Sequence, residues 1–134
     1  MKKVLVVEDD NISMELVSEI LNAEGFKTEA ASNGLEAIRM TDKVLYDIIL
    51  MDIELPGMDG IEATRIIKNR IKYKDVPIIA YTASAMRGDK ERIMKAGLDD
   101  YISKPIDVSD FINRMEKYRN GKKNRLNQNS LVIG

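Results

Sequence analysis

The hydrophobic residues of this chain fall into two patterns: short continuous apolar runs, and longer segments in which apolar residues recur at helical spacing. Short apolar runs bounded by turn residues are typical of strands that are buried on both faces of a parallel sheet. The clearest run, Ile48–Met51, leads directly into Asp52 and then into the turn residues Pro56 and Gly57. The predicted strands are Val4–Val7, Lys27–Ala31, Ile48–Met51, Ile78–Tyr81 and Tyr101–Ser103.

Each predicted strand is followed by a segment with helical spacing of apolar residues or with a helix-capping residue. Asp59 and Glu62 are spaced as the N-cap and N3 residues of a helix, and Asn33 and Glu36 repeat this spacing. The predicted helices cover about Ile12–Leu21, Leu35–Met40 and Gly60–Ile71, and run from the caps Asp89 and Asp107 to Lys95 and about Tyr118. In the third helix, Ile71 is predicted to lie on the buried stripe.

Strands and helices that alternate five times predict an α/β fold, in which one parallel sheet is covered by helices on both faces. The length of 134 residues suits one domain. Beyond Arg119 the chain is polar and basic until Leu131–Ile133. We therefore expect a domain over residues 1–119 and a basic polar tail or linker of low order over residues 120–134.

The composition narrows the possible chemistry. The net charge of −1 provides no overall basic footprint for nucleic acid, and no apolar run approaches the roughly 20 residues needed to span a membrane. The first residues lead directly into a strand without the apolar region of a signal peptide, so we expect a cytoplasmic protein. The chain has no Cys and no His, which excludes zinc sites built on these residues as well as Ser-His-Asp and Cys-His triads.

Polar residues that are unusual in buried strands follow four of the five predicted strands. Glu8, Asp9 and Asp10 follow the first strand, Asp52 the third, Thr82 the fourth and Lys104 the fifth. In open α/β sheets the carboxyl ends of parallel strands meet at one edge, where ligands bind. We therefore expect these side chains to form one site.

The predicted site combines acidic groups with one ammonium and one hydroxyl. Two carboxylates about 4 Å apart repel by on the order of 4 kcal/mol at an effective dielectric of about 20, unless a proton or a cation intervenes. Oxygen ligands without His or Cys suit Mg²⁺. A metal ion, an ammonium and a hydroxyl together suit a phosphoryl group. Asp52, central among them, can be the nucleophile that accepts it.

Each of these residues also has an ordinary structural interpretation. Asp10 or Asn11 can cap the first helix, Thr82 can belong to a turn, and Lys104 can be a solvated loop lysine. Tyr101 can simply be part of the core. The coincidence of polar residues at four strand ends favours the functional interpretation.

The chain from about Lys2 to Tyr118 resembles the response-regulator receiver domains of two-component signalling. The matching residues are the acidic pair Glu8-Asp9, the block from Leu50 to Gly60 that contains Asp52 and Pro56-Gly57, then Thr82-Ala83 and Lys104-Pro105. Their order and separations fit the family. The segments Thr82–Arg92 and Tyr101–Ile106 look most like stand-alone receivers of the DivK or CheY kind.

The resemblance implies a flavodoxin-like (βα)5 fold with strand order 2-1-3-4-5, and it implies roles for individual residues. Asp52 would be the phosphoacceptor. Mg²⁺, for which Mn²⁺ or Ca²⁺ can substitute, would be held by Glu8, Asp9, Asp52 and the backbone carbonyl of Glu54. The phosphoryl group would contact Thr82, Ala83 and Lys104; the switch pair would be Thr82 and Tyr101; the cis peptide bond would join Lys104 and Pro105.

The function implied by the resemblance is phosphorelay signal transduction by a single-domain response regulator. Because this chain has no His, the phosphohistidine donor would be another protein, a sensor histidine kinase or a histidine phosphotransfer protein. The receiver would catalyse only its own phosphorylation and dephosphorylation. Phosphorylation would reshape the face formed by the fourth helix, fifth strand and fifth helix, where a downstream protein would bind; we expect no nucleic-acid or membrane binding by this domain.

Three other interpretations remain open from the sequence. A phosphohydrolase with an aspartyl nucleophile is one, although Asp52-Ile53-Glu54 lacks the Asp-x-Asp-x-Thr pattern of haloacid-dehalogenase-like enzymes. A flavodoxin-like FMN carrier is another, although acids stand where its phosphate loop would follow the first strand. The third is a receiver module of a longer protein, in which the basic tail begins a linker.

Overall fold

All five predicted strands are present in the structure, a computed structural model that describes residues 1–83 and 90–119. The elements in chain order are β1 (Lys3–Val7), α1 (Asn11–Ala23), β2 (Lys27–Ala31), α2 (Gly34–Lys43), β3 (Ile48–Asp52), α3 (Gly60–Lys68), the short 3₁₀ helix η1 (Ile71–Tyr73), β4 (Ile78–Thr82), α4 (Lys90–Lys95), β5 (Asp100–Ser103) and α5 (Val108–Arg119). The predicted cap of α4, Asp89, lies outside the described residues.

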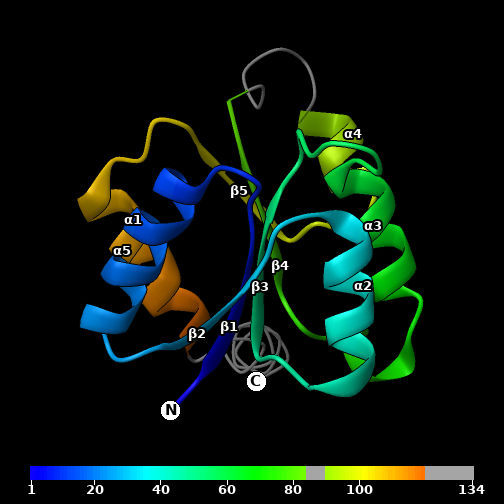
Figure 1. Cartoon of the computed structure of the whole chain (residues 1–134), viewed down its shortest axis with the longest axis horizontal. Coiled ribbons are helices and arrows are strands. Elements are labelled where there is room, and N and C mark those ends of the chain that lie inside the picture. Colours follow the sequence, from blue (N-terminus) through cyan, green and yellow to red (C-terminus); the bar gives the residue numbers. More distant parts are fainter. Residues whose placement is uncertain (84–89, 120–134) are drawn as a thin grey trace, which may run out of the picture.

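The strands form one parallel sheet in the order β2-β1-β3-β4-β5, which confirms the predicted topology. Helices α1 and α5 cover one face of the sheet, and α2, α3 and α4 cover the other (Figure 1). The central strands β3 and β4 are buried along their whole length. Burial on both faces explains why their sequences are continuous apolar runs rather than alternating patterns.

The sheet separates two hydrophobic cores, because successive side chains of a strand point to opposite faces. Val4 and Val6 of β1 pack into the core beneath α1 and α5, whereas Leu5 and Val7 pack into the core on the side of α2 and α3. The same alternation holds in β3 and β4. Whether a residue stands at an odd or an even position along its strand therefore decides which helices its side chain contacts.

The predicted side-chain caps of α1, α2 and α3 are present. Asn33 Oδ1 accepts a hydrogen bond from the backbone N–H of Glu36 at 2.8 Å, and Asp59 Oδ1 accepts one from the N–H of Glu62 at 2.9 Å. Asp10 Oδ2 accepts from the N–H of Ser13 at 2.9 Å. The structural interpretation of Asp10 as the cap of α1 is thus confirmed, and side-chain caps define where the helices begin.

The prediction for Ile71 was wrong. Helix α3 ends at Lys68, and Ile71 is 92% exposed. Arg70 adopts an extended backbone conformation, so the chain leaves the helix axis and restarts as η1. The residue that turns inward is Tyr73, whose buried hydroxyl donates to the carbonyl of Val44 at 2.6 Å. Helical periodicity had been extended past the point where the backbone breaks.

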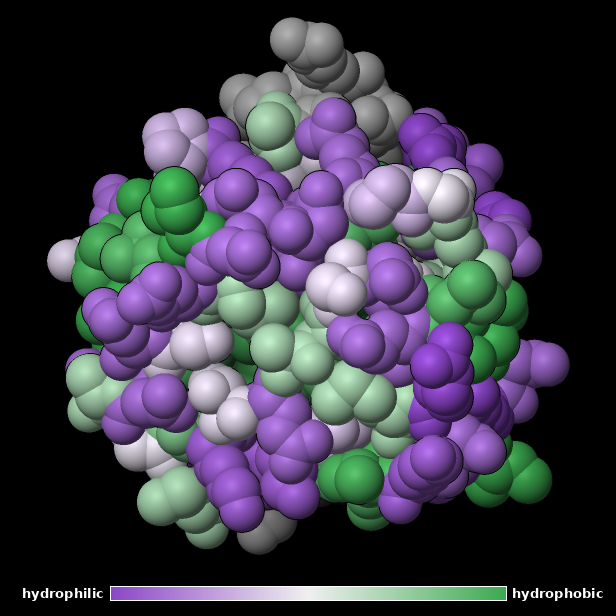
Figure 2. All heavy atoms as spheres, viewed as in Figure 1, coloured by the Kyte–Doolittle hydropathy of each residue, from purple (hydrophilic) through white to green (hydrophobic). Residues whose placement is uncertain are grey.

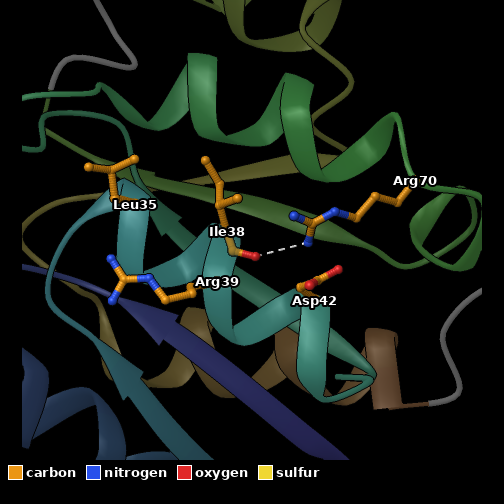
Figure 3. A pocket seen from close by; sticks show the side chains of 5 residues that line it. All are labelled: Leu35, Ile38, Arg39, Asp42 and Arg70. Carbon is orange, nitrogen blue, oxygen red and sulfur yellow. Dashed lines mark hydrogen bonds between the residues drawn. The ribbon is translucent and has the colours of Figure 1, made fainter.

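A surface pocket of about 340 Å³ lies where α2 meets the segment after α3. It is lined by Leu35, Ile38, Arg39, Asp42 and Arg70 (Figure 3). The Arg70 guanidinium points at α2 and donates to the carbonyl of Ile38 at 3.0 Å and to Thr41 Oγ1 at 2.6 Å. These bonds join the two segments. None of the lining residues belongs to the polar set predicted at the strand ends.

Candidate functional site

The carboxyl ends of β1, β3 and β5 bring together the residues that the sequence singled out. Glu8 directly follows β1, Asp52 is the last residue of β3, and Lys104 directly follows β5. The residue two positions before each of them belongs to the core beneath α1 and α5. By strand alternation, all three side chains start on that face of the sheet. The carboxyl ends of the strands point toward the top of Figure 1, and Figure 2 shows hydrophilic side chains in the upper part of the same view.

A single ammonium joins the two buried acids. Lys104 Nζ lies 3.0 Å from Glu8 Oε1 and 3.2 Å from Asp52 Oδ2. Glu8 and Asp52 are each 2% exposed, while the Lys104 side chain is 24% exposed. Charges removed from water in this way interact more strongly than surface pairs. One positive charge shared by two carboxylates leaves the site with excess negative charge.

The loop after β3 holds the other oxygen of Asp52. Asp52 Oδ1 accepts a hydrogen bond from the backbone N–H of Glu54 at 2.9 Å. The loop then turns at Gly57, whose φ of +76° favours glycine. Gly60, at the start of α3, packs so tightly that a Cβ there would lie 2.2 Å from the carbonyl oxygen of Asp52. The helix start is thereby pressed against the strand end.

Burial and hydrogen bonding shift the pKa values of the two buried acids in opposite directions. Burial, together with hydrogen bonding to Glu8, raises the pKa of Asp52 from its usual 3.8 to about 7. Burial acts against ionisation of Glu8 as well, but hydrogen bonds from Asp52 and Lys104 lower its pKa overall. For Lys104, burial is outweighed by Glu8 and Asp52, and its pKa is raised.

The acidic residues fit a hard divalent cation. Glu8, Asp9 and Asp52 each offer a carboxylate oxygen, and these oxygens lie within 4.8 Å of one another. Asp9 is exposed, while the other two are buried. An all-oxygen donor set with room for water is what Mg²⁺ prefers. Asp10 does not join this set, because its side chain caps α1.

Thr82, Ala83 and Tyr101 lie around this centre. Thr82 is fully buried, and its Oγ1 donates to Glu54 Oε1 at 3.3 Å. Ala83 is exposed in the turn after β4. Tyr101 is half-buried against the core on the side of α2 and α3. The peptide bond between Lys104 and Pro105 is cis. The functional roles of these residues remain predictions.

Tyr81 is a residue of the site that the sequence reasoning missed. It is 4% exposed, pairs with Asp52 across β3 and β4, and lies on the same face of the sheet. The Lys104 ammonium lies 4.4 Å from the centroid of its ring. The sequence carried no signal for it, because the register of β3 against β4, which pairs Tyr81 and not Thr82 with Asp52, is set by the tertiary structure.

The fold and the matched sequence define the class of this protein. Residues 4–116 match the family model of the response regulator receiver domain, and the chain belongs to this family. It is accordingly a receiver module of two-component phosphorelay signalling with a CheY-like flavodoxin fold. None of the helices in the described part of the chain is long and apolar enough to cross a membrane.

Among curated proteins, the chain is similar to polar-differentiation response regulators named DivK. The protein of Brucella anthropi is 43% identical over 117 residues, which are 87% of this chain and 95% of that protein. The protein of Brucella abortus is 42% identical over 117 residues, which again are 87% of this chain and 95% of that protein. The matched region therefore corresponds to nearly the whole of these relatives.

Solved structures agree with this assignment. The receiver domain of a sensor histidine kinase from Pseudomonas aeruginosa, with magnesium coordinated in its active-site cleft, is 34% identical, with a TM-score of 0.82 over 87% of this chain and 96% of that one. The response regulator TrrA from Thermotoga maritima, in complex with Mg²⁺ and BeF, is 32% identical, with a TM-score of 0.78 over 87% and 98%.

Proposed function

We propose that Asp52 accepts a phosphoryl group from a phosphohistidine on a partner protein. The observation that carries this proposal is the setting of its carboxylate, which is buried at a strand end and held between Lys104 Nζ at 3.2 Å and the Glu54 N–H at 2.9 Å. A buried carboxylate held by hydrogen bonds at both oxygens is oriented for attack.

The proposed transfer is a displacement at phosphorus. A carboxylate oxygen of Asp52 forms a bond to the phosphorus of the donor as the P–N bond of the phosphohistidine breaks. The electron pair of that bond returns to the donor imidazole, which takes up a proton from solvent. Hydrolysis later restores the carboxylate, when water adds to phosphorus and inorganic phosphate leaves. The chain's own catalysis is confined to these two steps.

Mg²⁺ would be held by the carboxylates of Glu8, Asp9 and Asp52 and by the backbone carbonyl of Glu54, and Mn²⁺ or Ca²⁺ can substitute. When bound, the ion supplies positive charge that stabilises the phosphoryl oxygens. The donor set of three clustered carboxylates supports this proposal. So do two similar structures, the receiver domain from Pseudomonas aeruginosa with magnesium in its active-site cleft and TrrA in complex with Mg²⁺ and BeF.

Lys104 would contact the arriving phosphoryl oxygens together with Thr82 and Ala83. Lys104 already touches Asp52, and its backbone N–H donates to the carbonyl of Thr82 at 3.0 Å. Loss of the Thr82 bond to Glu54 would let the hydroxyl turn toward the phosphoryl group, and Tyr101 would follow it inward. The face formed by α4, β5 and α5 would then bind a different downstream protein, by a shift between two populations.

The donor would be a sensor histidine kinase or a histidine phosphotransfer protein, and the relay would operate in the cytoplasm. We assign these roles to residues 1–119, with residues 120–134 as a basic tail or linker. An aspartyl phosphohydrolase is not favoured, because the curated relatives that cover most of this chain are named as response regulators.

Labelling by acetyl phosphate tests the proposal. The full chain with Mg²⁺ is expected to gain one phosphoryl group by intact mass, and Asp52→Asn is expected to gain none. Asp10→Asn is the matched control, because Asn also caps a helix and the carboxylate lost is exposed. Labelling that survives in Asp52→Asn would refute the assignment.

A further inference from the structure

The end of β4 presents two neighbouring side chains to opposite faces of the sheet. Thr82 lies on the same face of the sheet as Ala80, two positions earlier, which packs into the core beneath α2 and α3. The Thr82 hydroxyl donates a hydrogen bond to Glu54. Tyr81 packs into the core beneath α1 and α5 and stands beside Asp52 in the β3–β4 register. Tyr81 is therefore the residue of β4 that faces the row formed by the buried acids and Lys104.

The contact between Tyr81 and Lys104 joins a buried ring to a partly exposed cation. The ammonium of Lys104 lies 4.4 Å from the ring centroid, within the range of a cation–π interaction. The Tyr81 side chain is 4% exposed and packs into the core beneath α1 and α5. Core packing around the ring leaves it little freedom to move.

We propose that Tyr81 is a positioning residue that holds the Lys104 ammonium beside Asp52 while the charge of the site changes. This inference rests on the proposed function, because it concerns the same phosphoryl transfer. It adds a residue whose role is exerted through Lys104 rather than on the phosphoryl group itself.

The need for such a support follows from the other partners of Lys104. Its two carboxylate contacts, at 3.0 Å and 3.2 Å, are made to Glu8 and Asp52, the residues to which the proposed function assigns the metal ion and the phosphoryl group. Transfer converts Asp52 from a carboxylate to an acyl phosphate, so Lys104 must exchange its contact with the carboxylate for one with the phosphoryl oxygens. The quadrupole of the Tyr81 ring is unchanged by these events. The ring thus provides an attraction that persists through every state of the site.

The test compares Tyr81→Phe, which keeps the ring, with Tyr81→Leu and Tyr81→Met, which remove it. In nuclear magnetic resonance spectra of the full chain, the side-chain methylene protons of Lys104 should be shifted upfield by the ring in the wild type and in Tyr81→Phe. The shift should disappear in both ring-free variants. This readout depends on the contact alone and not on phosphorylation.

The second readout is the rate of labelling at Asp52 by acetyl phosphate. We expect about a tenfold decrease in the ring-free variants and less than about a threefold change in Tyr81→Phe. In a Lys104→Met background, Tyr81→Leu should cause no further decrease, because the ring acts through the ammonium. A merely structural role for the ring would slow both backgrounds equally.

The outcomes separate this inference from the proposed function. If a folded ring-free variant is labelled at the wild-type rate, or if Lys104 shows no ring shift in the wild type, the positioning role is wrong while Asp52 remains the acceptor. If the wild type itself is not labelled at Asp52, the proposed function fails and the positioning role fails with it.

Discussion

Asp52 occupies a position that is unfavourable for a charged group. It is 2% exposed, and it shares the ammonium of Lys104 with Glu8. Such a carboxylate weakens the folded state when ionised, because burial and the nearby negative charge are compensated only in part. The residue that makes the site reactive is thus expected to cost stability.

Replacement of Asp52 by Asn is expected to stabilise the metal-free protein. Folding raises the pKa of this carboxyl from 3.8 to about 7, so ionisation opposes folding and stability falls as the pH rises from about 4 through 7. At about pH 7.5 the Asn variant should be more stable by about 1–3 kcal/mol, and the difference should shrink toward about pH 4.5. Urea unfolding in the presence of a chelator measures both values.

Glu8 provides the internal check on this prediction. Its pKa is lowered in the folded state, so its contribution has the opposite sign: it is present at neutral pH and is lost on acidification. The free energy of unfolding of the Asn variant should therefore not gain on that of the wild type as the pH falls. If the difference between the two grew toward acidic pH, ionisation of Asp52 would not be what opposes folding.

Gly60 is expected to tolerate no side chain. A Cβ at this position would lie 2.2 Å from the carbonyl oxygen of Asp52 and 2.8 Å from Cα of Ile53, both backbone atoms that cannot move without shifting β3. Gly60→Ala should therefore destabilise the protein by about 3 kcal/mol or more. Urea unfolding measures the loss.

Gly57→Ala is the matched control. Gly57 has a φ of +76° but open space around its Cβ position. That substitution should cost only about 1–2 kcal/mol, the strain of a left-handed conformation. An equal loss in the two variants would show that backbone conformation, and not crowding against Asp52, makes glycine necessary in this loop.

At the scale of elements, the start of α3 connects the site to the rest of the fold. The helix begins directly after the loop that holds Asp52, and Asp59 caps it through the N–H of Glu62. The same carboxylate lies 3.8 Å from the Arg92 guanidinium, but both side chains are about half exposed, so this ion pair adds little.

Removal of this cap is expected to loosen the loop as well as the helix. Asp59→Ala should lower the free energy of unfolding by about 1 kcal/mol, because a backbone N–H of the first turn loses its partner. Asp59→Asn should be nearly neutral, since Asn caps equally well. Amide hydrogen exchange of Glu62 checks the local effect, and unchanged exchange in Asp59→Ala would contradict it.

At the scale of the whole molecule, a parallel sheet brings together acids that are far apart in the chain. Glu8 and Asp9 follow β1 and Asp52 ends β3, yet their oxygens cluster within 4.8 Å. A ligand that binds only this arrangement stabilises the folded state, because the unfolded chain has no such site.

Addition of Mg²⁺ is therefore expected to raise the melting temperature. At about ten times its dissociation constant, the ion should add about 1.4 kcal/mol, or about 3–6 °C for a domain of this size. Asp9→Asn should abolish most of the shift with little effect on the metal-free protein, because Asp9 is exposed. Asp10→Asn, one residue away and already used as a helix cap, should keep the full shift.

The sequence by itself determined much of this protein. Continuous apolar runs predicted the buried strands, cap spacing predicted where helices begin, and the strand-end residues Glu8, Asp52 and Lys104 predicted a shared site. These features are readable because burial on both faces and helix capping each depend on residues close together in the chain. The prediction went wrong at Ile71, where a backbone break interrupted the periodicity.

Only the tertiary structure decided what surrounds Asp52. The choice of Tyr81 over Thr82 as its neighbour depends on the register of β3 against β4, and the necessity of Gly60 depends on how closely α3 approaches the strand. These are distances between segments that are separate in the chain, and residue spacing carries no information about them.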